Sequence, residues 1–170
     1  ALRPHAREHA HQLIDRMLAA GPPADLVSDY ALPIPLALIC ELLGVPLQDR
    51  DRFKVWNDSL LSTRMEAAAQ TQRHLGELAA YIKGLVADRQ RQPRDDFMTA
   101  LTQAQEQGER LSEDELLLLC IAILVAGYEG SASQIPNFIQ VLLDNPRQWQ
   151  QLKDDPAQVP QAVEELLRYI

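Results

Sequence analysis

Residues 116–136 read LLLLCIAILVAGYEGSASQIP and form the most hydrophobic segment of this 170-residue chain. An uninterrupted apolar run extends from Leu116 to Ala126, and Glu129 follows it between two glycines, Gly127 and Gly130. A buried carboxylate costs much free energy unless it is paired, hydrogen-bonded or protonated. Folding alone does not require an acid at this place, so the segment is also the first place to look for function.

The segment is predicted to be one long helix. Ser112 is followed three residues later by Glu115, which is the pattern of a capping box directly before an apolar run. Because Leu116 to Val125 is apolar on every side, we expect the helix to be buried on most of its faces. It should extend to about Leu143, where Asn145 and Pro146 start another helix.

Helical periodicity continues on both sides of this segment, and no convincing alternating strand pattern is present. The sequence therefore predicts an all-α fold, a multi-helix orthogonal bundle around one long central helix. Residues 1–170 are expected to form one helical region. The other predicted helices cover about residues 5–20, 25–43 (bent by Pro33 and Pro35), 48–63, 66–92, 96–107 and 158–170.

Charge and cysteine content narrow the classes of partner. The formal net charge of −8 argues against nucleic acid as a partner, and the longest apolar run is too short for a membrane span of about 20 residues. Cys40 and Cys120 both lie among aliphatic residues, which favours buried thiols over a disulfide or a metal pair. A reducing, cytoplasmic compartment fits this use of cysteine.

Small residues recur at steps of four along the central helix and form a narrow stripe on a bulky helix. Such a stripe allows either close helix–helix packing or the close approach of a flat ligand, and the residues alone favour packing. The stripe consists of Ala122, Ala126 and Gly130, with Ile123, Gly127 and Ser131 beside them.

Two glycines and a proline weaken the same part of the helix. Gly127 and Gly130 each cost roughly 1 kcal/mol relative to alanine, and Pro136 removes the hydrogen bond to the carbonyl of Ala132. We therefore expect a break near the middle of the helix, with free carbonyls. Glu129 in this stretch could move protons, or it could simply reach a solvent channel or an arginine.

At this point the sequence resembles a known family. The segment AGYEGS, residues 126–131, is similar to the oxygen-binding motif of the cytochrome P-450 central helix, Ala/Gly-Gly-x-Asp/Glu-Thr-Thr/Ser. Glu165 and Arg168 in EELLRYI match the family's Glu-x-x-Arg motif. ELLGVPLQDRDRFKVW, residues 41–56, resembles a turn between two helices of soluble bacterial members. The three matches occur in the family's order and cover essentially the whole chain.

The resemblance implies a monooxygenase that carries haem b, receives two electrons from a separate ferredoxin-type partner and oxidises a small organic molecule with dioxygen. It places Glu129 as the acid of a proton relay, Ala126 and Gly127 in the groove for dioxygen and water, and Ala122 and Ile123 facing haem or substrate. The family's loop with the haem-ligand cysteine is absent here, so this chain holds no metal ligand and is expected to be a fragment of a larger domain.

Further roles follow from the same resemblance. Glu165 and Arg168 would form a buried ion pair that braces the haem side of the core. The predicted helices 48–63 and 66–92, with their connection near residues 62–66, would form a mobile lid over the substrate pocket.

Gly130 departs from the family pattern, which usually has threonine directly after the acid. Ser131 follows one position later and could supply the missing hydroxyl if the helix is locally rotated. A hydroxyl of the substrate or an ordered water could also replace it, and so could a reaction other than ordinary hydroxylation. The competing interpretation is a non-enzymatic helical scaffold that binds a partner or a carrier-bound ligand.

Two patterns near the start of the chain have the spacing of metal ligands but are incomplete. His5 and His9 in HAREH have the spacing of two metal ligands on one helix face, but no matching acidic ligand is evident in the sequence. Glu8 and His11 form a single Glu-x-x-His, whereas di-iron bundles need two.

The sequence also contains an ion pair near its end and a small cluster of arginines. Helix geometry alone favours Glu164 as the partner of Arg168, whereas the resemblance favours Glu165. The basic residues Arg89, Arg91 and Arg94 are interpreted as a solvated helix end.

Overall fold

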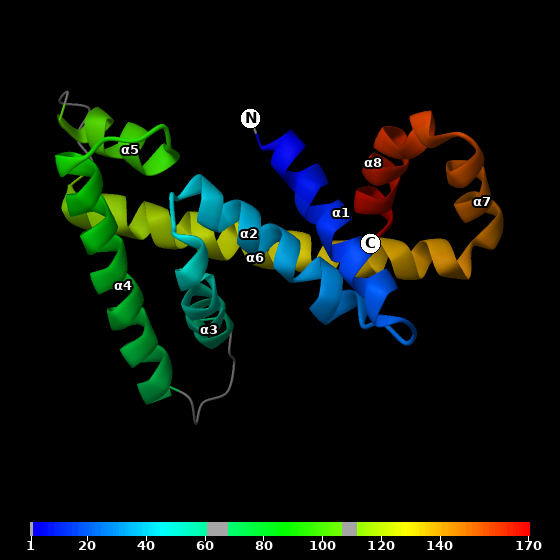
Figure 1. Ribbon diagram of the computed structural model, residues 1–170, viewed down its shortest axis with the longest axis horizontal. Coiled ribbons are helices and arrows are strands. Elements are labelled where there is room, and N and C mark those ends of the chain that lie inside the picture. Colours follow the sequence, from blue (N-terminus) through cyan, green and yellow to red (C-terminus); the bar gives the residue numbers. More distant parts are fainter. Residues whose placement is uncertain (1, 61–67, 107–111) are drawn as a thin grey trace.

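The computed structural model describes residues 2–60, 68–106 and 112–170, and within these ranges the chain contains helices and no strand. The principal helices are α1 (Arg3–Ala20), α2 (Pro33–Leu42), α3 (Arg50–Leu60), α4 (Ala68–Arg91), α5 (Phe97–Glu106), α6 (Glu113–Asp144), α7 (Pro146–Asp154) and α8 (Val159–Tyr169). The predicted all-α bundle around one central helix is confirmed (Figure 1). The predicted lid connection at residues 62–66 lies outside the described residues.

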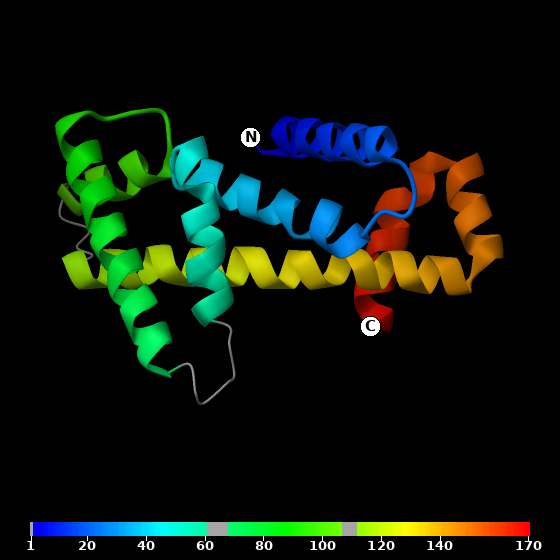
Figure 2. The same cartoon turned by 60° about the horizontal axis from the view of Figure 1, so that its bottom comes forward.

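The central helix α6 runs the length of the molecule (Figure 2). Its predicted capping box is present: the Ser112 hydroxyl accepts a hydrogen bond from the Glu115 amide at 3.2 Å, and the Glu115 carboxylate accepts one from the Ser112 amide at 2.7 Å. The helices α3, α4 and α5 gather at its N-terminal end, whereas α7 and α8 fold back at its C-terminal end. Helix α2 packs along its middle.

Only one face of α6 is buried by the described elements. The buried side chains recur at steps of four, which is one face of a helix: Leu116, Cys120, Leu124, Tyr128 and Ala132. The expectation that most faces are buried is wrong for this chain, since Leu118 is 64% exposed and Ala122 and Ala126 are also exposed. The described helices pack against α6 from one side, which leaves the opposite apolar face uncovered.

The length and apolar character of α6 also correct the prediction that the longest apolar run is too short to span a membrane. The segment Asp114–Asp144 has a mean hydropathy of 1.8 in its most apolar window, and only 28% of that window is buried. By length and composition alone this helix could cross a membrane. The same properties are found in the core helices of soluble proteins, so they do not assign α6 to a bilayer.

The predicted bent helix over residues 25–43 consists of two pieces. A π-helical turn, η1 (Val27–Ala31), precedes α2, and Pro33 stands in the first turn of α2 where its missing N–H costs nothing. Helix α2 ends at Leu42, and Gly44 shortly after it has a φ of +68°, in the left-handed region that glycine tolerates best. The two prolines therefore divide the segment instead of only bending it.

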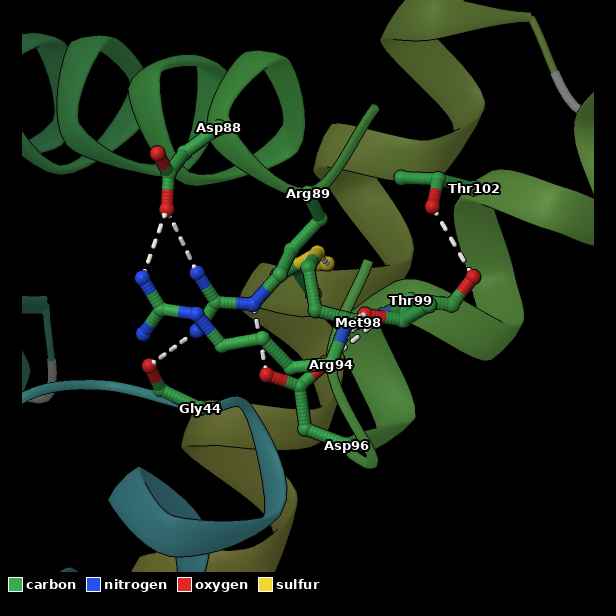
Figure 3. A network of polar contacts seen from close by, with 9 residues as sticks. Gly44, Asp88, Arg89, Arg94, Asp96, Met98, Thr99 and Thr102 are labelled. Atoms are coloured by element: carbon green, nitrogen blue, oxygen red, sulfur yellow. Dashed lines mark hydrogen bonds and ion pairs between the residues drawn. The ribbon is translucent and has the colours of Figure 1, made fainter. Parts of the chain in front are cut away.

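Arg89 corrects the interpretation of the basic cluster as a solvated helix end. Its side chain is only 2% exposed and bridges three elements (Figure 3). The guanidinium donates to Asp96 at 2.6 Å, to Asp88 at 2.7 Å and to the Gly44 carbonyl at 2.7 Å. An ideal Cβ at Gly44 would lie 2.6 Å from Arg89 Nη2, so this turn also needs glycine for space. Arg89 ties the end of α4 to the end of α2 and the start of α5.

Candidate functional site

The motif AGYEGS lies on α6, and its side chains point in two directions. Tyr128 is 2% exposed and belongs to the core, whereas Glu129, Gly130 and Ser131 are exposed. Burial, and secondarily the nearby charge of Asp58, raises the pKa of Tyr128 to about 12, so its phenol stays protonated at neutral pH. The motif therefore places an exposed acid and an exposed hydroxyl on either side of Gly130, since residues two apart on a helix project in different directions.

The small-residue stripe divides into a packing part and an open part. An ideal Cβ at Gly127 would lie 2.5 Å from Ile39 Cδ1 and 2.8 Å from Ile39 Cγ1, so Gly127 allows α2 to approach α6 closely. An ideal Cβ at Gly130 would meet nothing within 4 Å. Ile123 is half-buried against the core, while Ala122 and Ala126 are exposed on the side of Gly130. Helix packing thus accounts for Gly127 but not for the open face.

This division predicts opposite effects for the same substitution at two sites three residues apart. Gly127→Ala should lower the free energy of unfolding by about 1–3 kcal/mol, because the new methyl group overpacks the contact with Ile39. Gly130→Ala should raise it by about 0.5–1 kcal/mol, because alanine favours the helix and meets no neighbour. Denaturant unfolding of the haem-free form of the longest natural chain that contains this sequence measures both values, and a shared sign would contradict the division.

The expected break of α6 near Gly127, Gly130 and Pro136 is not observed. The helix is continuous from Glu113 to Asp144. The hydroxyl of Ser133 donates to the carbonyl of Glu129 at 2.9 Å and lies 3.2 Å from the carbonyl of Gly130. Back-bonding of this kind loosens a helix locally without ending it. Ser133 is not among the predicted site residues, although a serine four residues after Glu129 inside a helix is the pattern from which such a bond can be predicted.

Glu165 and Arg168 form the ion pair that the resemblance favours over Glu164. The Arg168 guanidinium donates two hydrogen bonds to the Glu165 carboxylate, at 2.9 Å and 2.5 Å. The hydrogen bonds from Arg168 lower the pKa of Glu165. The two side chains are 60% and 71% exposed within this chain, and their burial in the core of the larger haem domain stays a prediction. They lie on α8, whose outer surface no described element covers.

The two cysteines are buried free thiols, as predicted. Cys40 and Cys120 are both 0% exposed. Burial raises the pKa of Cys40 to about 12, against a smaller opposing effect of Arg50, and it raises the pKa of Cys120 to about 11. Thiols with such pKa values stay protonated, so neither cysteine supplies a thiolate at neutral pH.

The open face of α6 fits a flat group such as haem. Small or absent side chains at Ala122, Ala126 and Gly130 leave the helix backbone accessible, and the space beside Gly130 is free. The stripe itself carries no polar side chain, and Glu129 and Ser131 flank it at Gly130, which suits a mostly apolar macrocycle with polar groups at its edge.

Comparison with known proteins identifies the family. The sequence model of the family described as cytochrome P450 matches residues 47–166. The chain is 47% identical over 170 residues to the mycinamicin IV hydroxylase/epoxidase of Micromonospora griseorubida, covering 100% of this chain and 43% of that protein. It is 40% identical over 168 residues to the nocardicin C N-oxygenase of Nocardia uniformis subsp. tsuyamanensis, covering 99% of this chain and 42% of that protein.

Solved structures agree with the sequence relatives. The putative thioether synthase SgvP, involved in the tailoring step of griseoviridin, superposes with a TM-score of 0.94 at 36% identity, covering 99% of this chain and 43% of that one. The mixed-function P450 MycG superposes with a TM-score of 0.89 at 48% identity, covering 98% and 42%. The chain spans less than half the length of each of these relatives, and it belongs to the cytochrome P450 family.

Proposed function

We propose that residues 1–170 are the central helical region of a larger haem-thiolate monooxygenase, which oxidises a small organic molecule with dioxygen and two electrons. The observation that carries the proposal is the exposed small-residue stripe of Ala122, Ala126 and Gly130 on α6, with the exposed side chains of Glu129 and Ser131 on either side of Gly130. Its relatives include a hydroxylase/epoxidase acting on mycinamicin IV and a nocardicin C N-oxygenase, which supports a secondary metabolite as the substrate.

Haem b would lie against Ala122, Ala126 and Gly130, with its cysteine ligand outside this sequence. When bound, haem supplies the iron at which dioxygen is reduced and the substrate is oxidised. The residues of this chain would shape the oxygen side of that pocket. Gly127 and Ile123 would act mainly through packing, because they fix the position of α6 against α2 and the core.

Glu129 would hold and transfer the proton that reduction of dioxygen consumes. Its carboxylate lies on the exposed side of α6 among small residues, so water and the pocket can both reach it. A positioned acid or base next to the reacting group contributes typically 10²–10⁴-fold to a rate, which is the contribution we assign to Glu129.

Ser131 would supply the hydroxyl that Gly130 lacks. Ser131→Ala should lower the product formed per electron pair several-fold and raise the release of hydrogen peroxide, while substrate binding stays unchanged. Ser133→Ala is the matched control, because the Ser133 hydroxyl is already bonded to the carbonyls of Glu129 and Gly130. An unchanged product yield in Ser131→Ala would move this role to a substrate hydroxyl or an ordered water.

The partners follow from the same proposal. A ferredoxin-type protein would deliver the two electrons, and the enzyme would work in the cytoplasm without nucleic acid or membrane as a partner. The net charge of −8 is consistent with the absence of a nucleic-acid partner.

The competing candidate is a non-enzymatic scaffold, and Gly130 at the usual threonine position is the observation in its favour. The reduced, carbon-monoxide-bound Soret spectrum of the longest natural chain that contains this sequence separates the two. A red-shifted band of the thiolate type supports the monooxygenase. A folded chain that is supplied with haem and shows no such band supports the scaffold.

A further inference from the structure

A cleft of about 570 Å³ lies between α1, α2 and the first turn of α3. Its volume falls within the range of about 300–1,000 Å³ that is usual for sites that bind small organic molecules. None of the described residues of α6 belongs to its lining, so the cleft is separate from the face assigned to haem.

Two arginines from different helices meet at this cleft, Arg16 of α1 and Arg50 of α3. Neither forms an ion pair with any residue that the structure describes, although the protein carries a net charge of −8. Asp51 also lines the cleft. Two fixed positive charges thus face one negative charge, which favours a ligand with a single negative charge.

Arg50 has a donor group without an acceptor. Its Nε is shielded from solvent and has no hydrogen-bond partner among the described residues. The neighbouring carboxylate of Asp49 is engaged elsewhere, because its Oδ2 accepts a hydrogen bond from Tyr81 at 2.6 Å and its Oδ1 lies 3.7 Å from Arg52 Nη1. A shielded N–H group without a partner is unfavourable, and an acceptor bound in the cleft would remove this cost.

Arg16 is exposed on α1 and also lines a neighbouring cleft with Asp29. The Asp29 carboxylate already accepts hydrogen bonds from the Asp25 amide at 3.0 Å and from the Ser28 hydroxyl at 3.3 Å. Arg16 is therefore available to a ligand in the larger cleft. The planar guanidinium of arginine can hold a carboxylate through two parallel hydrogen bonds.

Part of the cleft wall is apolar. Leu36 and Ala37 of α2 are each only 8% exposed, and Leu13 lines the cleft from α1. A small inorganic anion would leave this wall unused, whereas a hydrocarbon group would bury apolar surface against it. The combination of arginines and an apolar wall matches a ligand that has a charged head and an apolar body.

The histidines of the HAREH segment are engaged with α2. His5 Nδ1 is hydrogen-bonded to Glu41 Oε1, and His9 Nε2 lies 3.8 Å from Glu41 Oε2. Within the described part of the chain, no group of three or more histidine, cysteine or acidic side chains could hold a metal ion. His9 borders the cleft with Glu41 beside it, so Arg16, Arg50 and Asp51 set the charge of the lining.

We propose that this cleft binds an organic monoanion with a carboxylate group and a hydrocarbon body. Arg16 and Arg50 would hold the carboxylate, and the apolar wall would contact the hydrocarbon. The bound molecule would join α1 to the start of α3. This site is independent of the proposed monooxygenase function, because the residues that form it do not belong to the stripe on α6.

Octanoate and 1-octanol test the site in the complete, haem-loaded protein, because they share a hydrocarbon chain and differ in the charged head. Calorimetry should show that octanoate binds at least about tenfold more tightly than 1-octanol, without a shift of the haem Soret band. Arg16→Gln and Arg50→Gln should each weaken octanoate binding by about tenfold, the loss of one charge-assisted hydrogen bond. Arg7→Gln is the matched control, since this exposed arginine of α1 lines a different cleft and should leave the affinity unchanged.

Three results would overturn the proposal. The first is no octanoate binding to the complete protein, which would mean that the cleft is covered or too weak to hold the anion. The second is binding that shifts the Soret band and is equally tight in both glutamine variants, which would place octanoate beside the haem. The third is a loss in Arg7→Gln as large as that in Arg16→Gln, which would indicate nonspecific attraction to α1. None of these results depends on turnover, so failure of this site and failure of the monooxygenase proposal are distinguishable.

Discussion

Glu129→Gln is expected to slow turnover of the complete enzyme by about 10²–10³-fold while the dissociation constant of the substrate changes little. Glutamine keeps the size of the side chain and its hydrogen-bonding capacity but cannot release or take up a proton near neutral pH. Glu129 is exposed on α6, so the substitution removes no packing and the folded state should persist. Single-turnover and steady-state rates, with binding measured separately, give the two quantities.

Glu164→Gln is the matched control for this experiment. It removes one carboxylate from an exposed position of α8, outside the motif on α6, and should leave the rate within about twofold of the wild type. Equal turnover by wild type and Glu129→Gln would remove Glu129 from the proton relay. A loss confined to substrate binding would instead make Glu129 a residue that contacts substrate.

Arg89→Met is expected to lower the free energy of unfolding by about 3–5 kcal/mol, the usual effect of removing one partner from a buried ion pair. Methionine fills similar space, but Asp96 Oδ2 and the carbonyl of Gly44 then lose the donor that Arg89 supplies. Denaturant unfolding of the complete protein, followed by circular dichroism, measures the change. Arg91→Met is the control: Arg91 is exposed on the same helix and should change stability by no more than about 0.5 kcal/mol.

The destabilisation caused by Arg89→Met should depend on pH, because Arg89 pairs with the titratable carboxyl of Asp96. Burial raises the pKa of Asp96, but hydrogen bonds from Thr99 and Arg89 outweigh it, so the pKa lies below the ordinary 3.8. A carboxyl with a lowered pKa in the folded state stabilises the fold above its unfolded pKa and loses this contribution as the pH falls through the folded value. The difference between wild type and Arg89→Met should therefore shrink below about pH 4. A constant difference down to acid unfolding would show that Asp96 is not the group responsible.

Helix periodicity and capping patterns, which involve residues close in sequence, predicted most of the secondary structure and the position of the AGYEGS motif on α6. The capping box of Ser112 and Glu115 and the proline start of α7 depend on residues that are close in sequence, so they were predictable. The π-helical turn before α2 was not, because proline restricts the backbone without specifying which hydrogen-bond register precedes it. Burial of the α6 faces was also mispredicted, since an all-apolar helix carries no periodic signal of which side is packed.

The sequence by itself determined that the chain is helical, that α6 is its central element, and that Glu129 lies among small residues on that helix. Those conclusions follow from hydrogen bonds and side-chain spacing within a few residues. Only the tertiary structure decided that Gly127 packs on Ile39 while Gly130 is open, that Arg89 is buried with Asp96, and that Glu41 faces His5 and His9. Each of these contacts joins separate elements, and the approach of those elements depends on the packing of the whole bundle. The sequence of one helix therefore does not specify which side chains of another helix it will contact.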